Sequence, residues 1–325
     1  MDFCKYYYEL LSVNNRKLCS LIIEQIKSFN HVITLNTDLS SSEIAYLFRV
    51  IDLDYPELFY FDIKSRPLEI VSCGQSKSIK VNYSYTPDQV TIYQKRIDNK
   101  LSPLKKYLIG KSILEKESII HNSLFKNVRY ENKDNIELHN IIGPFLQGKA
   151  VCEGFSKAFK YLCEFNDIPC MIVTGNGSNV LDGSLESHAW NIVKIENNYC
   201  HVDSTWNSLY YSIKTSPFPY YNVSDEFMKI DHTWDYSCTP VCKGMPKKEI
   251  PIFKSIKDLS YYIYERLSQQ QGIIIFDLDA SFPSKNNIPN TVYEIVNRQP
   301  KFHAKSVKVS YNTARNRTIC EVEYY

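Results

Sequence analysis

The sequence predicts an α+β protein with a helix-and-sheet core in the middle of the chain and a smaller α+β unit on either side. Its 325 residues leave room for two or three domains of roughly 100–200 residues each. Helical and short-strand patterns both recur, and the middle third places one helix directly before three strand patterns. We therefore divide the chain into an N-terminal unit (1–87), a helical lead-in with the core (88–250) and a C-terminal unit (251–325).

The composition is that of a folded globular protein. Apolar residues make up 44% of the chain and charged residues 23%, both near the average for such proteins. The formal net charge is only +2, so no strong field would attract nucleic acid or an anionic membrane. We expect neither as a partner.

The ten cysteines are scattered and include no Cys-x-x-Cys pair, and a chain of this length has no need of disulfides to supplement its core. The first residues lack the basic and apolar regions of a signal peptide. No stretch approaches the ~18 apolar residues that would span a bilayer. These features predict a reducing, cytoplasmic location.

The N-terminal unit begins with a helical pattern over residues 1–28. A second helix is predicted to begin after the capping-type residues Asp38–Glu43 and to end at Pro56. Short strands separated by polar or glycine-containing turns are predicted at 58–63, 68–73 and 79–85.

The rest of the chain again combines both patterns. A helical region from Asp88 to about Val128 is expected to be interrupted near Ser102–Pro103. A helix from about Cys152 to Asn166 follows, and the polar segment 176–187 is predicted to be a loop at the rim of the site that sets substrate choice. Further strands are predicted at 170–174, 188–195, 199–203 and 272–278, helices near 256–271 and 291–297, and two strands at the end.

Three residues of the middle third carry the chemistry of a thiol nucleophile. Cys152 lies in a first helical turn, where free backbone N–H groups and the helix dipole favour the thiolate, which is the nucleophilic form. His188 opens a strand and Asp203 ends the next strand. In this order they would supply a nucleophile, a base and a carboxylate that orients the base.

The spacing places a condition on this triad. A tight hairpin about Asn197–Asn198 would put Asp203 opposite Ile192, four residues away from His188. The Asp203–His188 contact therefore requires strand twist, a bulge or a different register.

Three motifs resemble those of the bacterial transglutaminase-like superfamily over about residues 113–243. They are Q-G-K-A-V-C-E-G-F-S-K-A-F at 147–159, H-A-W-N at 188–191 and H-V-D-S-T-W at 201–206. The resemblance implies a papain-like core in which a nucleophile helix packs on an antiparallel sheet. It implies that Cys152 is the nucleophile, His188 the general base and then acid, and Asp203 the orienting carboxylate.

Three further residues are candidates for supporting roles. The Gln147 amide, five residues before Cys152, is a candidate second oxyanion donor beside the Cys152 backbone N–H, with a solvated loop glutamine as the alternative. Trp190 and Trp206 are predicted to form the wall of the site by packing beside the triad.

We therefore predict a cysteine-dependent acyl-transfer enzyme that attacks a peptide or amide carbonyl and forms a thioester, with hydrolysis favoured over transglutamination. The alternatives are a peptide-binding scaffold without turnover and an amide-forming cyclase. We expect a peptide or protein substrate and no cofactor. A zinc site is not predicted, because its possible ligands follow no spacing typical of zinc sites; these ligands are His201, His232, Cys238 and Cys242.

Overall fold

The computed structural model describes most of the chain. The described residues are 3–63, 68–133, 135–178, 185–212, 220–244, 251–270, 273–283, 287–299, 302, 304–312 and 317–324. Contacts between Cα atoms divide the chain into two units, Met1–Ser208 with Tyr220–Met245 and Leu209–Pro219 with Pro246–Tyr325. The first unit includes both the segment before residue 88 and the core, and the three-part division stays a prediction.

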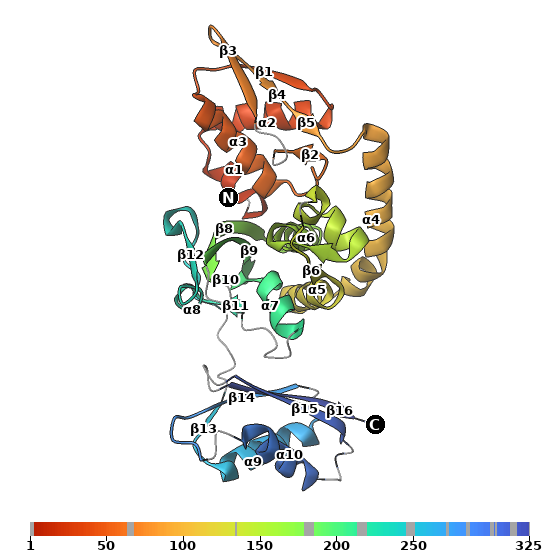
Figure 1. The fold of residues 1–325 in the computed structure, drawn as a ribbon, viewed down its shortest axis with the longest axis vertical. Coiled ribbons are helices and arrows are strands. Elements are labelled where there is room, and N and C mark those ends of the chain that lie inside the picture. Colours follow the sequence, from red (N-terminus) through yellow and green to blue (C-terminus); the bar gives the residue numbers. More distant parts are fainter. Residues whose placement is uncertain are drawn as a thin grey trace. The chain divides into compact units, whose positions relative to one another are not determined.

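The N-terminal segment combines helices with a small antiparallel sheet of strand order β1-β4-β3 (Figure 1). Its elements are α1 (Tyr6–Leu10), α2 (Val13–Lys27), β1 (Val32–Asn36), α3 (Ser41–Asp54), β2 (Phe61–Asp62), β3 (Glu69–Cys73), β4 (Ser76–Lys80) and β5 (Asn82–Tyr83). A capping box between Ser40 and Glu43 starts α3, as the sequence predicts. The single helix predicted over 1–28 is wrong, because Leu11 is extended and Ser12 caps a new helix. Strand β1 was not predicted.

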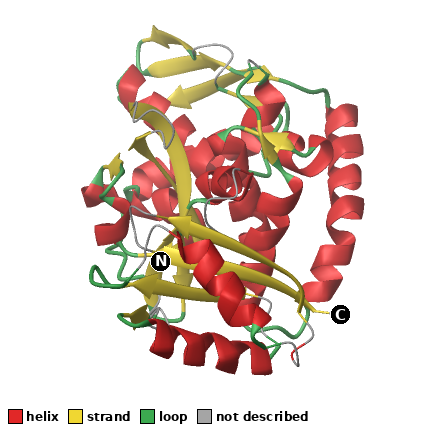
Figure 2. Cartoon of the chain, turned by 60° about the horizontal axis from the view of Figure 1, so that its bottom comes forward, coloured by secondary structure: helices red, strands yellow, loops and turns green. Residues whose placement is uncertain are grey.

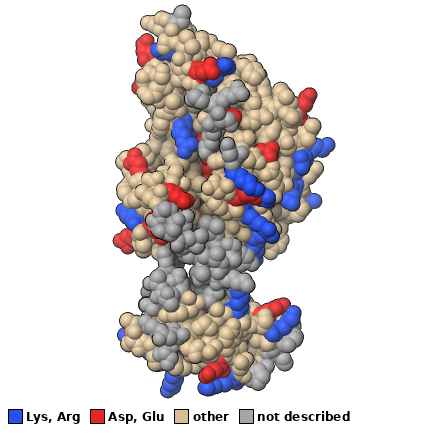
Figure 3. Space-filling model, viewed as in Figure 1, with Lys and Arg blue, Asp and Glu red and all other residues tan. Residues whose placement is uncertain are grey.

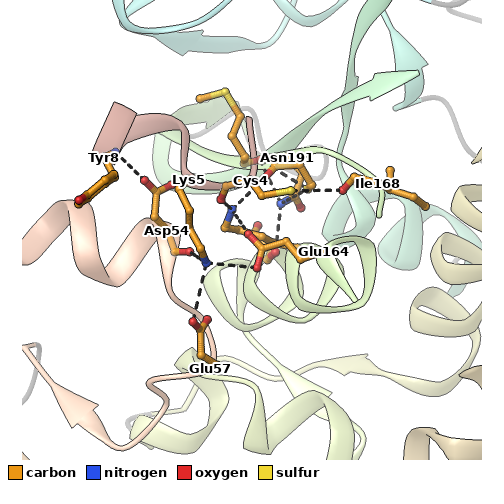
Figure 4. A network of polar contacts seen from close by, with 12 residues as sticks. Cys4, Lys5, Tyr8, Asp54, Glu57, Glu164, Ile168 and Asn191 are labelled. Carbon is orange, nitrogen blue, oxygen red and sulfur yellow. Dashed lines mark hydrogen bonds and ion pairs between the residues drawn. The ribbon is translucent and has the colours of Figure 1, made fainter. Parts of the chain in front are cut away.

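Polar contacts attach the start of the chain to the core (Figure 4). The Lys5 ammonium donates to the Asp54 carbonyl at 2.6 Å and lies 3.4 Å from a Glu164 carboxylate oxygen. The Asp54 carboxylate accepts from the Tyr8 N–H at 2.8 Å, and the Tyr7 hydroxyl donates to the Ile172 carbonyl at 2.8 Å. The start of the chain is thereby held against both the helix that contains Glu164 and the core sheet.

The lead-in to the core consists of α4 (Pro87–Leu108) and α5 (Ile113–Asn127). The predicted interruption near Ser102–Pro103 is wrong, since α4 continues through Pro103. Pro103 is exposed, and the buried side of the helix carries Leu101 and Leu108 on either side of it. Packing along that side continues across the proline, and water can satisfy the backbone carbonyl that loses its intrahelical donor.

The core is the helix α6 packed on a five-stranded antiparallel sheet of order β11-β10-β9-β8-β12. Its elements are β6 (Arg129–Tyr130), the π-helical turn Gly143–Gln147, β7 (Lys149–Ala150), α6 (Cys152–Glu164), β8 (Cys170–Ser178), β9 (Leu185–Ile195), β10 (Asn198–Val202), α7 (Ser204–Ser212), β11 (Tyr221–Val223), α8 (Asp225–Met228) and β12 (His232–Trp234). The loop predicted at 176–187 is wrong at both ends, because β8 and β9 pair as far as Ser178 and Leu185. Residues 179–184 lie outside the described part.

The second unit has two helices on one face of a four-stranded sheet of order β13-β14-β16-β15 (Figures 1 and 2). Its elements are β13 (Ile252–Phe253), α9 (Ile256–Ser268), β14 (Ile273–Leu278), α10 (Ile288–Asn297), β15 (Ala304–Asn312) and β16 (Arg317–Tyr324). Buried side chains such as Ile263, Phe276 and Val292 form its core. The predicted helices and strands of this region are confirmed.

None of the helices in the described parts of the chain combines the length and the apolar character that crossing a lipid bilayer requires.

Candidate active site

Cys152 is the first residue of helix α6. Val151 at the N-cap has no side-chain oxygen, so no side chain caps the first backbone N–H groups of this helix. Two residues later, a Cβ on Gly154 would lie 2.2 Å from the Leu138 carbonyl oxygen. The glycine of the Cys-Glu-Gly motif thus lets a neighbouring segment pass close to the turn that carries the thiol.

The register of the β9–β10 hairpin brings Asp203 to His188. Asn198 pairs with Ile195 and Val202 pairs with Asn191, so the turn consists of residues 196 and 197. If the pairing were extended by one residue beyond Val202 and Asn191, Asp203 would lie opposite Trp190, two residues from His188. The hairpin assumed from the sequence is therefore wrong by two residues. The observed register gives a distance of 2.7 Å between His188 Nε2 and Asp203 Oδ2.

The Asp203 carboxylate is fully buried and held by several donors. Its Oδ1 accepts from the backbone N–H groups of Thr205 and Trp206 at 2.9 and 3.0 Å, at the start of α7. Burial raises the pKa of Asp203, but the charge and hydrogen bond of His188, with a bond from His232, outweigh it and hold the pKa below its usual range. Asp203 is therefore an anion.

His188 is poised between this carboxylate and the thiol. Because Nε2 contacts Asp203, Nδ1 is the ring nitrogen left for a second partner. Burial by itself lowers the pKa of His188, but the Asp203 charge and hydrogen bonds with Asp203 and the Cys152 side chain raise it to about 10. The structure thus brings together the three predicted triad residues.

Trp190 and Trp206 both pack against the imidazole of His188. Their ring centroids lie 5.9 and 5.2 Å from that of His188. Both indoles are buried. A Cβ on Gly177 would lie 2.7 Å from the Trp206 ring, so a residue without a side chain makes room for it. Both indoles thus lie beside His188, and their role as a wall of the site stays a prediction.

The side chain of Gln147 has a hydrogen-bond partner outside the triad. Its side chain is exposed, and its amide donates to the Glu137 carboxylate. This hydrogen bond gives no support to an oxyanion role, which stays a prediction.

One residue that lies beside this site, His232, was not predicted from the sequence. His232 Nε2 lies 3.4 Å from Asp203 Oδ2, and its Nδ1 lies 2.6 Å from Asp231 Oδ1. The sequence signal was the Asp231–His232 pair, but nothing in the local pattern shows that β12 pairs with β8 and so brings His232 beside Asp203.

The four possible zinc ligands do not converge. Within the described residues, the donor atoms of His232 group with His188 and Asp203, and those of His201 and Cys242 group with Asp225. Hydrogen bonds within the protein account for both groups. His201 Nδ1 accepts from the Trp190 indole at 3.0 Å, so its Nε2 carries the proton and cannot be a metal ligand. Cofactor independence stays a prediction.

Residues 105–204 match the family model of the transglutaminase-like superfamily. The human protein named Kyphoscoliosis peptidase is 35% identical over 90 residues, a stretch that covers 26% of this chain and 13% of that protein.

Two solved structures show a partial likeness. A TGase aligns at 13% identity over 54% of this chain and 51% of its own, with a TM-score of 0.31. The periplasmic domain of TgpA from Pseudomonas aeruginosa aligns at 12% identity over 42% of this chain and 55% of its own, with a TM-score of 0.28. The family match supports a cysteine-dependent enzyme in the general sense. Residues 105–204 of this chain are thus similar to the transglutaminase-like superfamily.

Proposed function

We propose that this chain is a cysteine-dependent acyl-transfer enzyme that acts on a peptide or amide carbonyl, with hydrolysis as its main reaction. Cys152 is the nucleophile, His188 the general base and then acid, and Asp203 the carboxylate that orients His188. The observation that carries the proposal is the His188 imidazole, which contacts Asp203 at 2.7 Å through Nε2 and interacts with Cys152.

The chemistry proceeds in two steps. In the first, the Cys152 sulfur forms a bond to the carbonyl carbon, the bond to the leaving amine breaks, and the thiol proton reaches that amine through His188. In the second, water attacks the thioester and gives a proton to His188. The carbon–sulfur bond then breaks, and the thiol regains a proton. An amine in place of water would give transglutamination or ring closure.

Three features support the remaining parts of the proposal. On the face drawn in Figure 3, acidic and basic side chains are interspersed over the described surface, as suits a peptide or protein substrate better than nucleic acid. Cys152 is partly exposed and therefore accessible to a substrate, whereas Cys19, Cys163 and Cys200 are buried. The nine cysteines whose state is described are free thiols, in keeping with a cytoplasmic location.

The first test is labelling by iodoacetamide between pH 4 and 9, followed by mass spectrometry of each cysteine in wild type and His188→Ala. We expect Cys152 to label much faster than the other cysteines at acidic pH and to lose this advantage in the variant. Chelator-treated protein should behave like untreated protein.

The acceptor is tested separately by incubating the enzyme with casein and with or without a primary amine such as monodansylcadaverine. Peptide products without amine incorporation would support hydrolysis, and incorporation would support transfer. If Cys152 labels slowly in both wild type and His188→Ala, the enzyme proposal fails and the peptide-binding scaffold becomes the better explanation.

A further inference from the structure

We propose that His232 is a positioning residue of this site, which bridges Asp203 and Asp231 as an imidazolium and adds a second positive charge behind the His188–Asp203 pair. This inference rests on the proposed function, since it concerns the same thiol and imidazole. It assigns a role to a buried histidine that the two-step chemistry does not use.

Both nitrogens of His232 face carboxylate oxygens. Nδ1 lies 2.6 Å from Asp231 Oδ1, and Nε2 lies 3.4 Å from Asp203 Oδ2. A neutral imidazole carries one proton and would leave a lone pair facing an anion on one side. Only the doubly protonated ring donates to both carboxylates.

The surroundings of His232 fix its ring in this position. The ring is buried and lies 4.3 Å from the Trp206 ring and 5.0 Å from the Trp190 ring, between centroids. The strand pairing of His232 with Gly177 holds its backbone, and the Tyr220 hydroxyl orients Asp231 by donating to it at 2.5 Å.

The charged and titratable groups around His232 determine whether it favours or disfavours the thiolate of Cys152. Asp203 and Asp231 bind it directly, the His188 ring is centred 5.5 Å away, and His201 interacts with it electrostatically. The Tyr220 ring packs against it at 5.4 Å between centroids.

Of the two charges in the His232–Asp231 pair, the cation is the one that contacts Asp203 and faces the triad. Its positive potential favours the thiolate of Cys152 at acidic pH. Replacing His232 by a neutral residue removes this potential and leaves Asp231 as an unbalanced anion. Labelling of Cys152 slows as its thiolate is protonated at low pH, and we call this part of the pH profile the acid limb. The acid limb should then move to higher pH.

The test is the pH dependence of Cys152 labelling by iodoacetamide between pH 3 and 7. For His232→Gln we expect the acid limb to move up by about half a pH unit. At a fixed pH on this limb, Cys152 should then be labelled about threefold more slowly than in wild type. For Asp231→Asn we expect a shift in the opposite direction, because the cation remains while its counter-ion is lost. A role limited to packing would change the amplitude without moving the limbs in opposite directions.

The matched control is His201→Gln. His201 is as buried as His232, but its partners are Trp190 and Asp225 and it does not contact Asp203. This variant should leave the acid limb in place.

Unmoved limbs, or shifts of the same sign in His232→Gln and Asp231→Asn, would overturn the inference. Asp231 is partly exposed, so Asp231→Asn tests it alone if His232→Gln does not fold. The two proposals fail in different ways. Slow labelling of Cys152 in wild type rejects the proposed function, whereas fast labelling with unmoved limbs rejects the role of His232 alone.

Discussion

Among the described residues of the core, two groups each contain a cysteine, a histidine and an aspartate. In one, Cys152, His188 and Asp203 come together. In the other, donor atoms of His201, Asp225 and Cys242 lie within 4.8 Å of one another. The histidine–aspartate distances are nearly equal, at 2.7 Å for His188–Asp203 and 2.8 Å for His201–Asp225.

The difference lies in the second nitrogen of each imidazole. In His201 it accepts from the buried indole of Trp190, so this ring has no site for a thiol proton. Burial accordingly lowers the pKa of His201, although Asp225 opposes this, whereas Asp203 and Cys152 overcome burial in His188. A buried histidine–aspartate pair becomes a base only when its other nitrogen faces a proton donor that can react.

The cysteines differ in the same sense. Cys152 is partly exposed at a helix N-terminus, while Cys242 is buried and its thiol points to the Pro240 carbonyl. Burial raises the pKa of Cys242 well above its ordinary value, so its thiol stays protonated. We interpret the second group as structural.

The largest expected effect separates the two thiols. Cys152→Ala should lower hydrolysis of the probe ester p-nitrophenyl acetate by at least about 10³-fold, because the nucleophile is lost. Cys242→Ala should leave the rate within about threefold of wild type. Equal losses in both variants, measured by absorbance on protein of verified fold, would break the distinction.

The next largest effect separates the carboxylates. Asp203→Ala should slow turnover of the same ester by about 10²-fold or more, because His188 loses its orientation and the charge that stabilises its imidazolium. Asp225→Ala should mainly reduce the free energy of unfolding, by about 1–3 kcal/mol, since the buried His201 loses its acceptor. Urea unfolding and ester hydrolysis together distinguish the two outcomes, and a catalytic loss in Asp225→Ala would contradict our interpretation.

The two histidines should affect stability with opposite dependence on pH. The His188 pKa is raised to about 10, so its contribution to stability is fully present below the unfolded value of about 6.5. It is lost as pH rises through about 10. The His201 pKa is lowered, so this residue reduces stability as pH falls below about 6.5.

Urea unfolding at pH 5, 7 and 10 measures this difference. The stability advantage of wild type over His188→Gln should shrink by a few kcal/mol at most toward pH 10. The advantage over His201→Gln should shrink toward pH 5. If the loss of unfolding free energy depended on pH in the same way in both variants, the two imidazoles would have the same electrostatic environment.

The smallest effect concerns the wall beside His188. Gly177→Ala places a Cβ 2.7 Å from the Trp206 ring and should cost about 1–3 kcal/mol of stability while slowing Cys152 labelling. Gly110→Ala is the control, because no heavy atom lies within 4 Å of its Cβ and its φ of +76° makes only backbone strain relevant. It should cost about 1–2 kcal/mol through backbone strain without changing the labelling rate.

The order of the three triad residues could be read from the sequence because each belongs to a local pattern. Cys152 opens an amphipathic helix, His188 lies in a strand and Asp203 directly follows the next strand, so helix and strand periodicity locate them. The helices and strands of the second unit follow from the same periodicity. The break in α4 expected at Pro103 failed because packing along the whole helix outweighed a local preference.

What the sequence determined by itself was the α+β class and the choice of a cysteine, a histidine and an aspartate as candidate site residues, because residue type and periodicity are local properties. Only the tertiary structure decided the hairpin register that brings Asp203 to His188. It also decided the pairing of β12 with β8 that adds His232, and the Trp190 hydrogen bond that occupies His201. These depend on contacts between segments distant in sequence, and a change of one or two residues in pairing would give each histidine a different partner.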